Sequence, residues 1–100
     1  MALLVKVDGS TTEIKLPKEG VLRHLYGLLD CDTVECLPVV LDSTNPDVCS
    51  EYEGVLSDET ARITGKDPNR LATKMSGRDP HPPMYHILGD CVFYKEGEVE

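Results

Sequence analysis

DETARITGKDPNRLATKM, residues 58–75, is the stretch that decides how the chain folds. It carries four of the ten basic residues of a protein whose formal net charge is −8. We expect a short strand over residues 61–64, a Gly-Lys-Asp-Pro break, and a short helix over residues 69–75. Asp67 can cap that helix, and Pro68 suits its first position because the N–H that proline lacks has no helical partner there. The stretch therefore predicts a strand-turn-helix unit with basic side chains.

Upstream of this unit, the chain opens with a predicted hairpin. Residues 3–7 and 12–16 alternate between apolar and polar side chains, which is the period-two pattern of a half-buried strand. Asp8-Gly9 lies between the two runs and is a strong signal for a tight turn, and Pro17 ends the second run. We expect the two strands to pair in antiparallel fashion.

A helix is predicted over residues 21–29, because its apolar residues recur on one face. Gly20 and Gly27 lower its intrinsic propensity by about 1 kcal/mol each relative to alanine, so packing against the hairpin must compensate. The apolar positions are Val21, Leu22, Leu25, Leu28 and Leu29. The side chains expected to point elsewhere, toward solvent or a partner, are Arg23, His24 and Tyr26.

Three further runs predict strands. Residues 32–41 are rich in β-formers, and Pro38 confines this strand to a sheet edge, a bulge or two separate pieces because proline cannot donate to a central ladder. Residues 55–56 are a short apolar indication of a second strand. Residues 85–94 predict the last one, with a kink at a Gly-Asp pair.

The fold class predicted from this order is α+β. One hundred residues are enough for one domain, which we place at residues 1–95 with a frayed acidic tail at 96–100. We expect a small antiparallel or mixed sheet covered by one main helix, with a hairpin-helix-strand start like that of a β-grasp domain. Residues 42–54 and 77–83 are rich in turn formers and are predicted loops.

The composition points to an aliphatic core and to self-association. Apolar residues make up 40% of the chain, but only one phenylalanine and four tyrosines are aromatic. A chain of this size buries a smaller share of its surface than a larger domain does. We therefore expect a homo-oligomer, in which contact between copies buries the remainder.

The charge is strongly acidic and unevenly distributed. Residues 30–59 contain nine acidic side chains and no basic one, whereas residues 61–80 contain five basic and two acidic ones. A net charge of −8 argues against direct binding to nucleic acid or to an anionic membrane, since both repel it. A local site for a small anion is compatible with the basic segment.

The sequence favours an intracellular protein in the cytoplasm. No apolar run is long enough to span a bilayer, and the one at the start is too short for a signal peptide. The four cysteines are irregularly spaced, and in an unsecreted chain they are expected to be reduced thiols.

Neither a metal site nor a catalytic site is predicted, and no cofactor is expected. Cys31 and Cys36 are five residues apart, whereas a structural zinc site favours pairs spaced as C-x2-C, so we interpret the cysteines as free thiols. A nucleophile such as Cys49 or Ser76 would need a histidine beside it, but no nucleophile motif is present. The two histidines considered for that role are His81 and His86.

Paired carboxylates are the next candidate. They could perform acid-base chemistry only if burial moved their pKa values apart. We interpret them as a solvated face, which could also mimic the charge of nucleic acid toward a host protein. The pairs are Asp30 with Asp32, Glu51 with Glu53, and Asp58 with Glu59.

A ligand site is predicted in the basic segment, where a helix start would favour a phosphate and an arginine could hold it by two parallel hydrogen bonds. The competing interpretation is structural: Asn69 would only shape the turn, and Arg70 would pair with the acidic loop at residues 42–59. The predicted ligand-binding residues are Lys66, Asn69, Arg70, Thr73 and Lys74. Gly65-Lys66 is not a P-loop, because the preceding glycine and the following Ser or Thr are missing.

The same segment carries a family resemblance through the motif GKDPNRLAT, residues 65–73. It resembles the family catalogued as domain of unknown function 3846, whose members are small proteins of phages and bacterial mobile elements. Residues 3–7, 21–29, 32–36 and 87–90 are also similar to that family. The residues before the acidic turn are less apolar than in the family, and residues 76–84 are longer. The resemblance implies a compact α+β fold and a viral origin, and it implies no activity.

Together these observations predict a non-enzymatic module that binds a small anionic ligand. In a phage setting it would sequester a nucleotide-type host signal in the host cytoplasm. The alternative is an acidic inhibitor or decoy that binds a host defence or DNA-binding protein. A small hydrolase acting on the same nucleotides is a third hypothesis.

Overall fold

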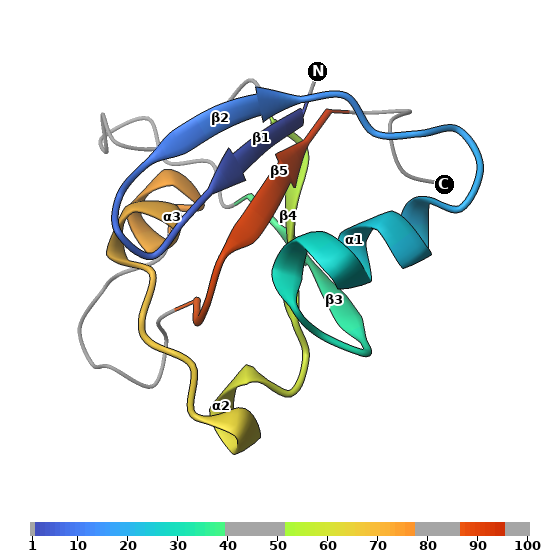
Figure 1. Ribbon diagram of the computed structural model, residues 1–100. Coiled ribbons are helices and arrows are strands. Elements are labelled where there is room, and N and C mark those ends of the chain that lie inside the picture. The colour runs from blue at the N-terminus through green and yellow to red at the C-terminus, as the bar shows by residue number, and fades with distance from the viewer. Residues whose placement is uncertain (1, 40–51, 78–86, 96–100) are drawn as a thin grey trace.

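The computed structural model describes residues 2–39, 52–77 and 87–95 (Figure 1). Within them, five strands form one sheet in the order β2-β1-β5-β4-β3, and every neighbouring pair is antiparallel. Helices accompany the sheet, so the fold is α+β. The elements in chain order are β1 (Ala2–Val5), β2 (Thr11–Ile14), α1 (Val21–Leu29), β3 (Val34–Pro38), β4 (Gly54–Asp58), α2 (Ala61–Thr64), α3 (Arg70–Met75) and β5 (Cys91–Tyr94).

The predicted hairpin is confirmed. β1 pairs with β2 from Ala2↔Ile14 to Val5↔Thr11. At the turn, the Lys6 N–H donates to the Ser10 carbonyl at 2.9 Å, and Gly9 has a φ of 90°, a left-handed conformation that glycine adopts without a steric penalty.

The last strand lies in the middle of the sheet. β5 pairs with β1 on one side and with β4 on the other, so the end of the chain joins the opening hairpin to the β3–β4 pair. Side chains that face each other across these strands share a face of the sheet. Leu4, Val92 and Leu56 therefore form one cross-strand row on one face, and Phe93 with its two neighbours forms a row on the other.

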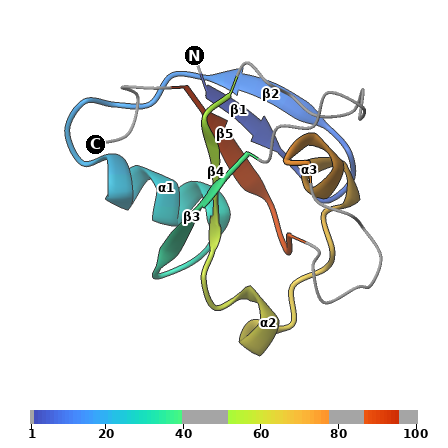
Figure 2. The same ribbon diagram turned by 180° about the vertical axis from the view of Figure 1, so that it is seen from behind.

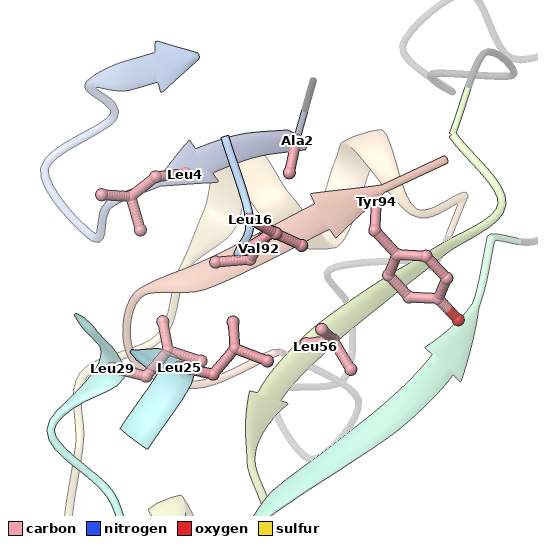
Figure 3. Close-up of a cluster of buried hydrophobic side chains, with 8 residues drawn as sticks. All are labelled: Ala2, Leu4, Leu16, Leu25, Leu29, Leu56, Val92 and Tyr94. Carbon is pink, nitrogen blue, oxygen red and sulfur yellow. The ribbon is translucent and has the colours of Figure 1, made fainter. Parts of the chain in front are cut away.

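Both faces of the sheet are covered, each by its own core (Figures 1 and 2). On one face, α1 lies over a cluster of aliphatic side chains and Tyr94, drawn in Figure 3: Ala2, Leu4, Leu16, Leu25, Leu29, Leu56, Val92 and Tyr94. On the other face, α3 packs through Ala72, with Leu71 and Met75, against a second cluster. The buried residues of the second core are Val5, Tyr52, Val55, Ala72, Ile87, Cys91 and Phe93.

This arrangement does not confirm a sheet covered by one main helix, because α1 and α3 cover opposite faces. The β-grasp likeness is not confirmed either and stays a prediction. The predicted helix over residues 21–29 is confirmed with the same bounds. Leu25 and Leu29 are buried, but Leu22 is 50% exposed at the margin of the apolar face.

The predicted strand over residues 61–64 is wrong, because this segment is the helix α2. Immediately after β4, the Thr60 N–H and hydroxyl both donate to Asp58 Oδ1 at 2.9 Å, which turns the chain away from the sheet. The Ile63 and Thr64 N–H groups then donate to the Thr60 carbonyl. Ile63 is 87% exposed, so its β-branched side chain has no strand to pack against.

β4 is an inner strand, although only residues 55–56 indicated it. All five of its residues are buried, since each face of the sheet carries a core. A strand buried on both faces lacks the alternation that reveals a half-buried one. β3, in contrast, lies at the sheet edge, which is one of the three arrangements predicted from Pro38, and it spans Val34–Pro38 within the predicted residues 32–41.

The predicted loops fall largely outside the described residues, at 40–51 and 78–86, as does the tail at 96–100. The first part of the predicted last strand, residues 85–86, is also outside them. In the part of the chain that the structure describes, no helix combines the length and apolarity needed to cross a membrane.

Candidate functional site

Lys66, the first of the predicted ligand residues, joins two parts of the fold through its side chain. Its Nζ lies 2.8 Å from Asp58 Oδ2, 2.7 Å from the Leu29 carbonyl and 2.8 Å from the Asp30 carbonyl. An ammonium has three N–H donors, and these three acceptors use all of them. Lys66 therefore ties the C-terminal end of α1 to β4 and has no donor left for a ligand.

The aliphatic part of the Lys66 side chain also explains why residue 89 is a glycine. A Cβ on Gly89 would lie 2.9 Å from Lys66 Cδ, and Gly89 itself has a φ of 77°. The absence of a side chain at this position lets the lysine stem cross the backbone just before β5. Gly89, the glycine of the predicted Gly-Asp kink, thus leaves the space that the Lys66 side chain occupies.

Asp58 is buried, which contradicts the interpretation of the 58–59 pair as a solvated face. Its side chain is 2% exposed and receives hydrogen bonds from Lys66 and Thr60. Burial raises the pKa of Asp58, but the bonds from Lys66 and Thr60 outweigh it and hold that pKa below its usual value. The carboxylate stays ionised and serves as the counter-charge of Lys66.

Asn69 is fully buried and holds three segments together. Its amide donates to the Val5 carbonyl and the Gly89 carbonyl, each at 3.0 Å, and lies 3.8 Å from Cys91 Sγ. Its Oδ1 accepts the Ala72 N–H at 3.1 Å, which makes Asn69 the N-cap of α3. Both amide hydrogens and the oxygen are therefore engaged inside the protein.

Asp67 as N-cap and Pro68 as first helical residue are therefore wrong. Residues 67–69 instead run beside residues 87–89. The Asn69 N–H donates to the Ile87 carbonyl at 2.7 Å, and the Gly89 N–H donates to the Asp67 carbonyl at 2.8 Å. Between these two bonds, Pro68 and Leu88 lie opposite each other as in an antiparallel strand pair. The helix begins at Arg70 because these bonds keep the preceding residues extended.

Thr73 and Ser76 are also buried and internally bonded. Thr73 Oγ1 donates to the Asn69 carbonyl at 2.7 Å and accepts the Ile87 N–H at 2.9 Å. Ser76 Oγ donates to the Thr73 carbonyl at 2.8 Å. Thr73 therefore fixes α3 against the strand region, and Ser76, considered above as a nucleophile, lies in the interior with its hydroxyl engaged.

Arg70 and Lys74 are the two predicted ligand residues that face solvent. They lie four residues apart on α3, so their side chains project from the same side of the helix. No ion pair joins either of them to another described residue, and the acidic loop proposed as the partner of Arg70 lies mostly outside the description. The structure thus separates the five predicted residues into three internal and two exposed ones.

The cysteines have distinct environments. Cys91 is buried, and burial raises the pKa of its thiol. Cys36 is exposed on β3, and its Sγ lies 2.6 Å from the hydroxyl oxygen of Tyr94. Burial, reinforced by the hydrogen bond with Cys36, raises the pKa of Tyr94 to about 12. Cys31 is half-buried, and Cys49 lies outside the described residues, as do His81 and His86.

Among the described residues, no group of three or more histidine, cysteine, aspartate or glutamate side chains could hold a metal ion. The sequence reasoning missed the Asp58–Lys66 pair and the Cys36–Tyr94 contact. The turn that Asp58 makes with Thr60 had a local signal, because aspartate two residues before threonine often turns the chain by bonding its backbone, but the pair with Lys66 had none. The Cys36–Tyr94 contact depends on the register of β3 against β4 and β5, which the sequence does not display.

A scan of protein-family models, a search of curated proteins and a search of solved structures gave no match to this chain. The resemblance of residues 65–73 to the phage family stays a prediction.

Proposed function

We propose that the protein is a non-enzymatic binding module that holds a small anionic ligand of nucleotide type against the exposed side of α3. Arg70 and Lys74 make the contact. The observation that carries this proposal is their exposure on a helix whose inner side is fixed by Asn69 and Thr73. The internal residues thus position the two cations without touching the ligand.

The chemistry of the two side chains suits a phosphate. The planar guanidinium of Arg70 can donate two parallel hydrogen bonds to phosphate oxygens, and Lys74 adds a second positive charge one helical turn away. The first turn of α3 offers less than predicted, because Asn69 already accepts the Ala72 N–H. Binding therefore rests on side-chain charge, and we expect it to weaken as salt screens that charge.

The biological setting belongs to the same proposal. A phage protein of this kind would sequester a nucleotide signal of the host in the host cytoplasm and thereby act against a defence response. The resemblance of GKDPNRLAT to small phage proteins supports this setting. Neither direct nucleic-acid binding nor membrane binding is part of it, since the net charge of −8 opposes both.

The test is calorimetric titration with cyclic and ADP-ribose-type nucleotides. We expect binding by the natural chain and its loss in the Arg70→Ala/Lys74→Ala double variant. The matched control is Lys6→Ala/Lys18→Ala, which removes the same charge from two exposed positions elsewhere and should leave binding intact. Absence of binding by the natural chain across the nucleotide set would overturn the proposal. Chromatography of the same mixtures would reveal a new product if the protein were instead a hydrolase.

A second candidate is the acidic inhibitor or decoy, and one structural observation favours it. Asp30, Asp32 and Glu59 are exposed and gather where α1 ends and β3 begins, because the Glu59 N–H donates to the Thr33 carbonyl. This function predicts a salt-sensitive protein partner from host lysate. Retention should disappear in the Asp30→Asn/Asp32→Asn/Glu59→Gln variant and persist in Arg70→Ala/Lys74→Ala. The reverse pattern would count against the decoy.

A further inference from the structure

The outer edge of β2 presents backbone groups that no described strand pairs. The Lys6 N–H donates to the Ser10 carbonyl, and Leu4 faces Thr12 in the same ladder. Because bonding direction alternates along an antiparallel strand, the even-numbered residues of β2 bond to β1. Thr11 and Glu13 therefore point their N–H and C=O groups outward. Such an edge is a template for a further strand.

The side chains along this edge are self-complementary. Ile14 is half-buried against the first core, and its neighbours Glu13 and Lys15 are exposed with opposite charges. Lys15 continues the alternation of β2, because Leu16 after it returns to the core. The sequence Glu-Ile-Lys thus reads acidic, apolar, basic along the edge, with the two charges on the same face of the sheet.

We propose that β2 pairs with β2 of a second copy of this chain, antiparallel about a two-fold axis at Ile14. In that register, Glu13 lies opposite Lys15 of the second copy, and Lys15 lies opposite its Glu13. Both pairs exchange backbone hydrogen bonds, while Ile14 meets Ile14 of the second copy at the closer, non-hydrogen-bonded spacing. The sheet then continues from one protomer into the next.

The opposite edge of the sheet does not suit self-pairing. The Val39 N–H donates to the Glu53 carbonyl and Thr33 accepts from Glu59, so odd-numbered residues of β3 bond to β4. The outward positions therefore include Pro38, which has no N–H to donate. β3 also carries Glu35 without any lysine or arginine. Two copies of β3 would bring acidic side chains together with no compensating cation, so the charge pattern selects β2.

Charge reversal tests this interface directly. Glu13→Lys places two lysines opposite each other in both cross-strand pairs, and Lys15→Glu places two glutamates there. Like charges directly opposite destabilise strand pairing, so we expect each single variant to dimerise about tenfold or more weakly than the natural chain. The double variant Glu13→Lys/Lys15→Glu restores opposite charges and should restore the dimer. Sedimentation velocity over a concentration series measures all four proteins.

Mixing the two single variants tests whether the charges at positions 13 and 15 meet across the interface. A Glu13→Lys chain beside a Lys15→Glu chain has opposite charges in both pairs, so the mixture should form a heterodimer at concentrations where each component alone associates far more weakly. Circular dichroism of each variant checks that it is folded, and Lys18→Glu, an exposed change outside the strand, should leave the dimer unchanged. A monomeric natural chain, or no association in the mixture, would overturn the proposal. The proposal does not depend on the anion site, because Arg70 and Lys74 lie on α3.

Discussion

The helices on the two faces of the sheet are attached mainly by different kinds of interaction. α1 is nine residues long and covers its face with leucines, although Gly20 gives it no side-chain cap and Gly27 lies inside it. α3 is six residues long, and buried hydrogen bonds attach it to the opposite face: Asn69 donates to two carbonyls there, and Thr73 Oγ1 accepts the Ile87 N–H. A helix of that length is not stable by itself in water. The longer helix is held by apolar burial and, at its C-terminal end, by Lys66, whereas the shorter one depends on the buried bonds of Asn69 and Thr73.

The difference matters for the candidate site. Apolar contacts tolerate small shifts of a helix, whereas a buried amide must keep its partners within hydrogen-bond distance. Asn69 reaches β1, the segment before β5 and α3 at once. Arg70, the next residue, consequently stands on a helix whose start is positioned by buried hydrogen bonds.

The largest effect is expected from breaking the core on the α3 face. Phe93 is fully buried there, and its ring meets Tyr52 edge-on with centroids 5.9 Å apart. Phe93→Ala should lower the free energy of unfolding by about 3–5 kcal/mol, through lost burial and the cavity left behind. Chemical denaturation measures the loss. Leu25→Ala, its counterpart on the α1 face, should cost about 2–5 kcal/mol, and a negligible effect of either would contradict the assigned cores.

Asn69→Ala tests the directional bonds themselves. It leaves the Val5 and Gly89 carbonyls and the Ala72 N–H without their partner, so we expect a loss of about 3 kcal/mol in unfolding free energy. Asn69→Asp keeps the acceptor for the N-cap but removes both amide donors, and it should also destabilise the protein. Arg70→Ala, one position along and exposed, should change stability by less than about 0.5 kcal/mol. Equal effects of Asn69→Ala and Arg70→Ala would show that the buried bonds of Asn69 do not hold α3 in place.

The Asp58–Lys66 pair connects α1 to the strand before α2, and its effect depends on pH. Because the folded-state pKa of Asp58 is lowered from its usual 3.8, the unfolded chain binds this proton more readily than the folded one. The stability from the pair is thus present above that usual value and is lost as the pH falls through the lower folded-state pKa. Asp58→Asn should cost about 2 kcal/mol at neutral pH, since Lys66 loses its charged partner.

The measurement for this pair is denaturant unfolding at a series of pH values. The stability gap between the natural chain and Asp58→Asn should narrow below about pH 4 as the natural carboxylate becomes protonated. Glu59→Gln, a neutralisation at the adjacent exposed position, is the control and should show no comparable gap. A gap that stays constant down to low pH would show that the carboxylate charge is not what holds Lys66.

The sequence predicts those parts of the fold whose causes are local. The Asp8-Gly9 turn indicates the hairpin, the spacing of leucines indicates α1, and Pro38 indicates the edge position of β3. β4 was nearly missed because burial on both faces removes its alternation.

The burial of the predicted ligand residues could be predicted only in part, for a different reason. Asn69 and Arg70 are adjacent and both polar, yet one is fully buried and the other exposed. Their separation depends on residues 87–89, which pair with residues 67–69 from a distant part of the chain. Nothing within the motif distinguishes a side chain that fixes the helix from one that faces a ligand.

The smallest expected change in stability comes from a substitution inside α1. Gly27 lies inside α1, without a positive φ, and a Cβ built on it would meet nothing within 4 Å. Gly27→Ala should therefore raise the free energy of unfolding by about 0.5–1 kcal/mol, because alanine restricts the unfolded chain and favours the helix. Gly54→Ala is the opposite control, since its Cβ would lie 2.6 Å from the Tyr94 hydroxyl and 2.9 Å from the Leu37 carbonyl and should destabilise the sheet. Thermal unfolding of both variants measures these two opposite changes in stability. Alanine at this position raises the helix propensity of α1 without changing which residues the helix buries, so a destabilised Gly27→Ala would contradict the open space beside Gly27.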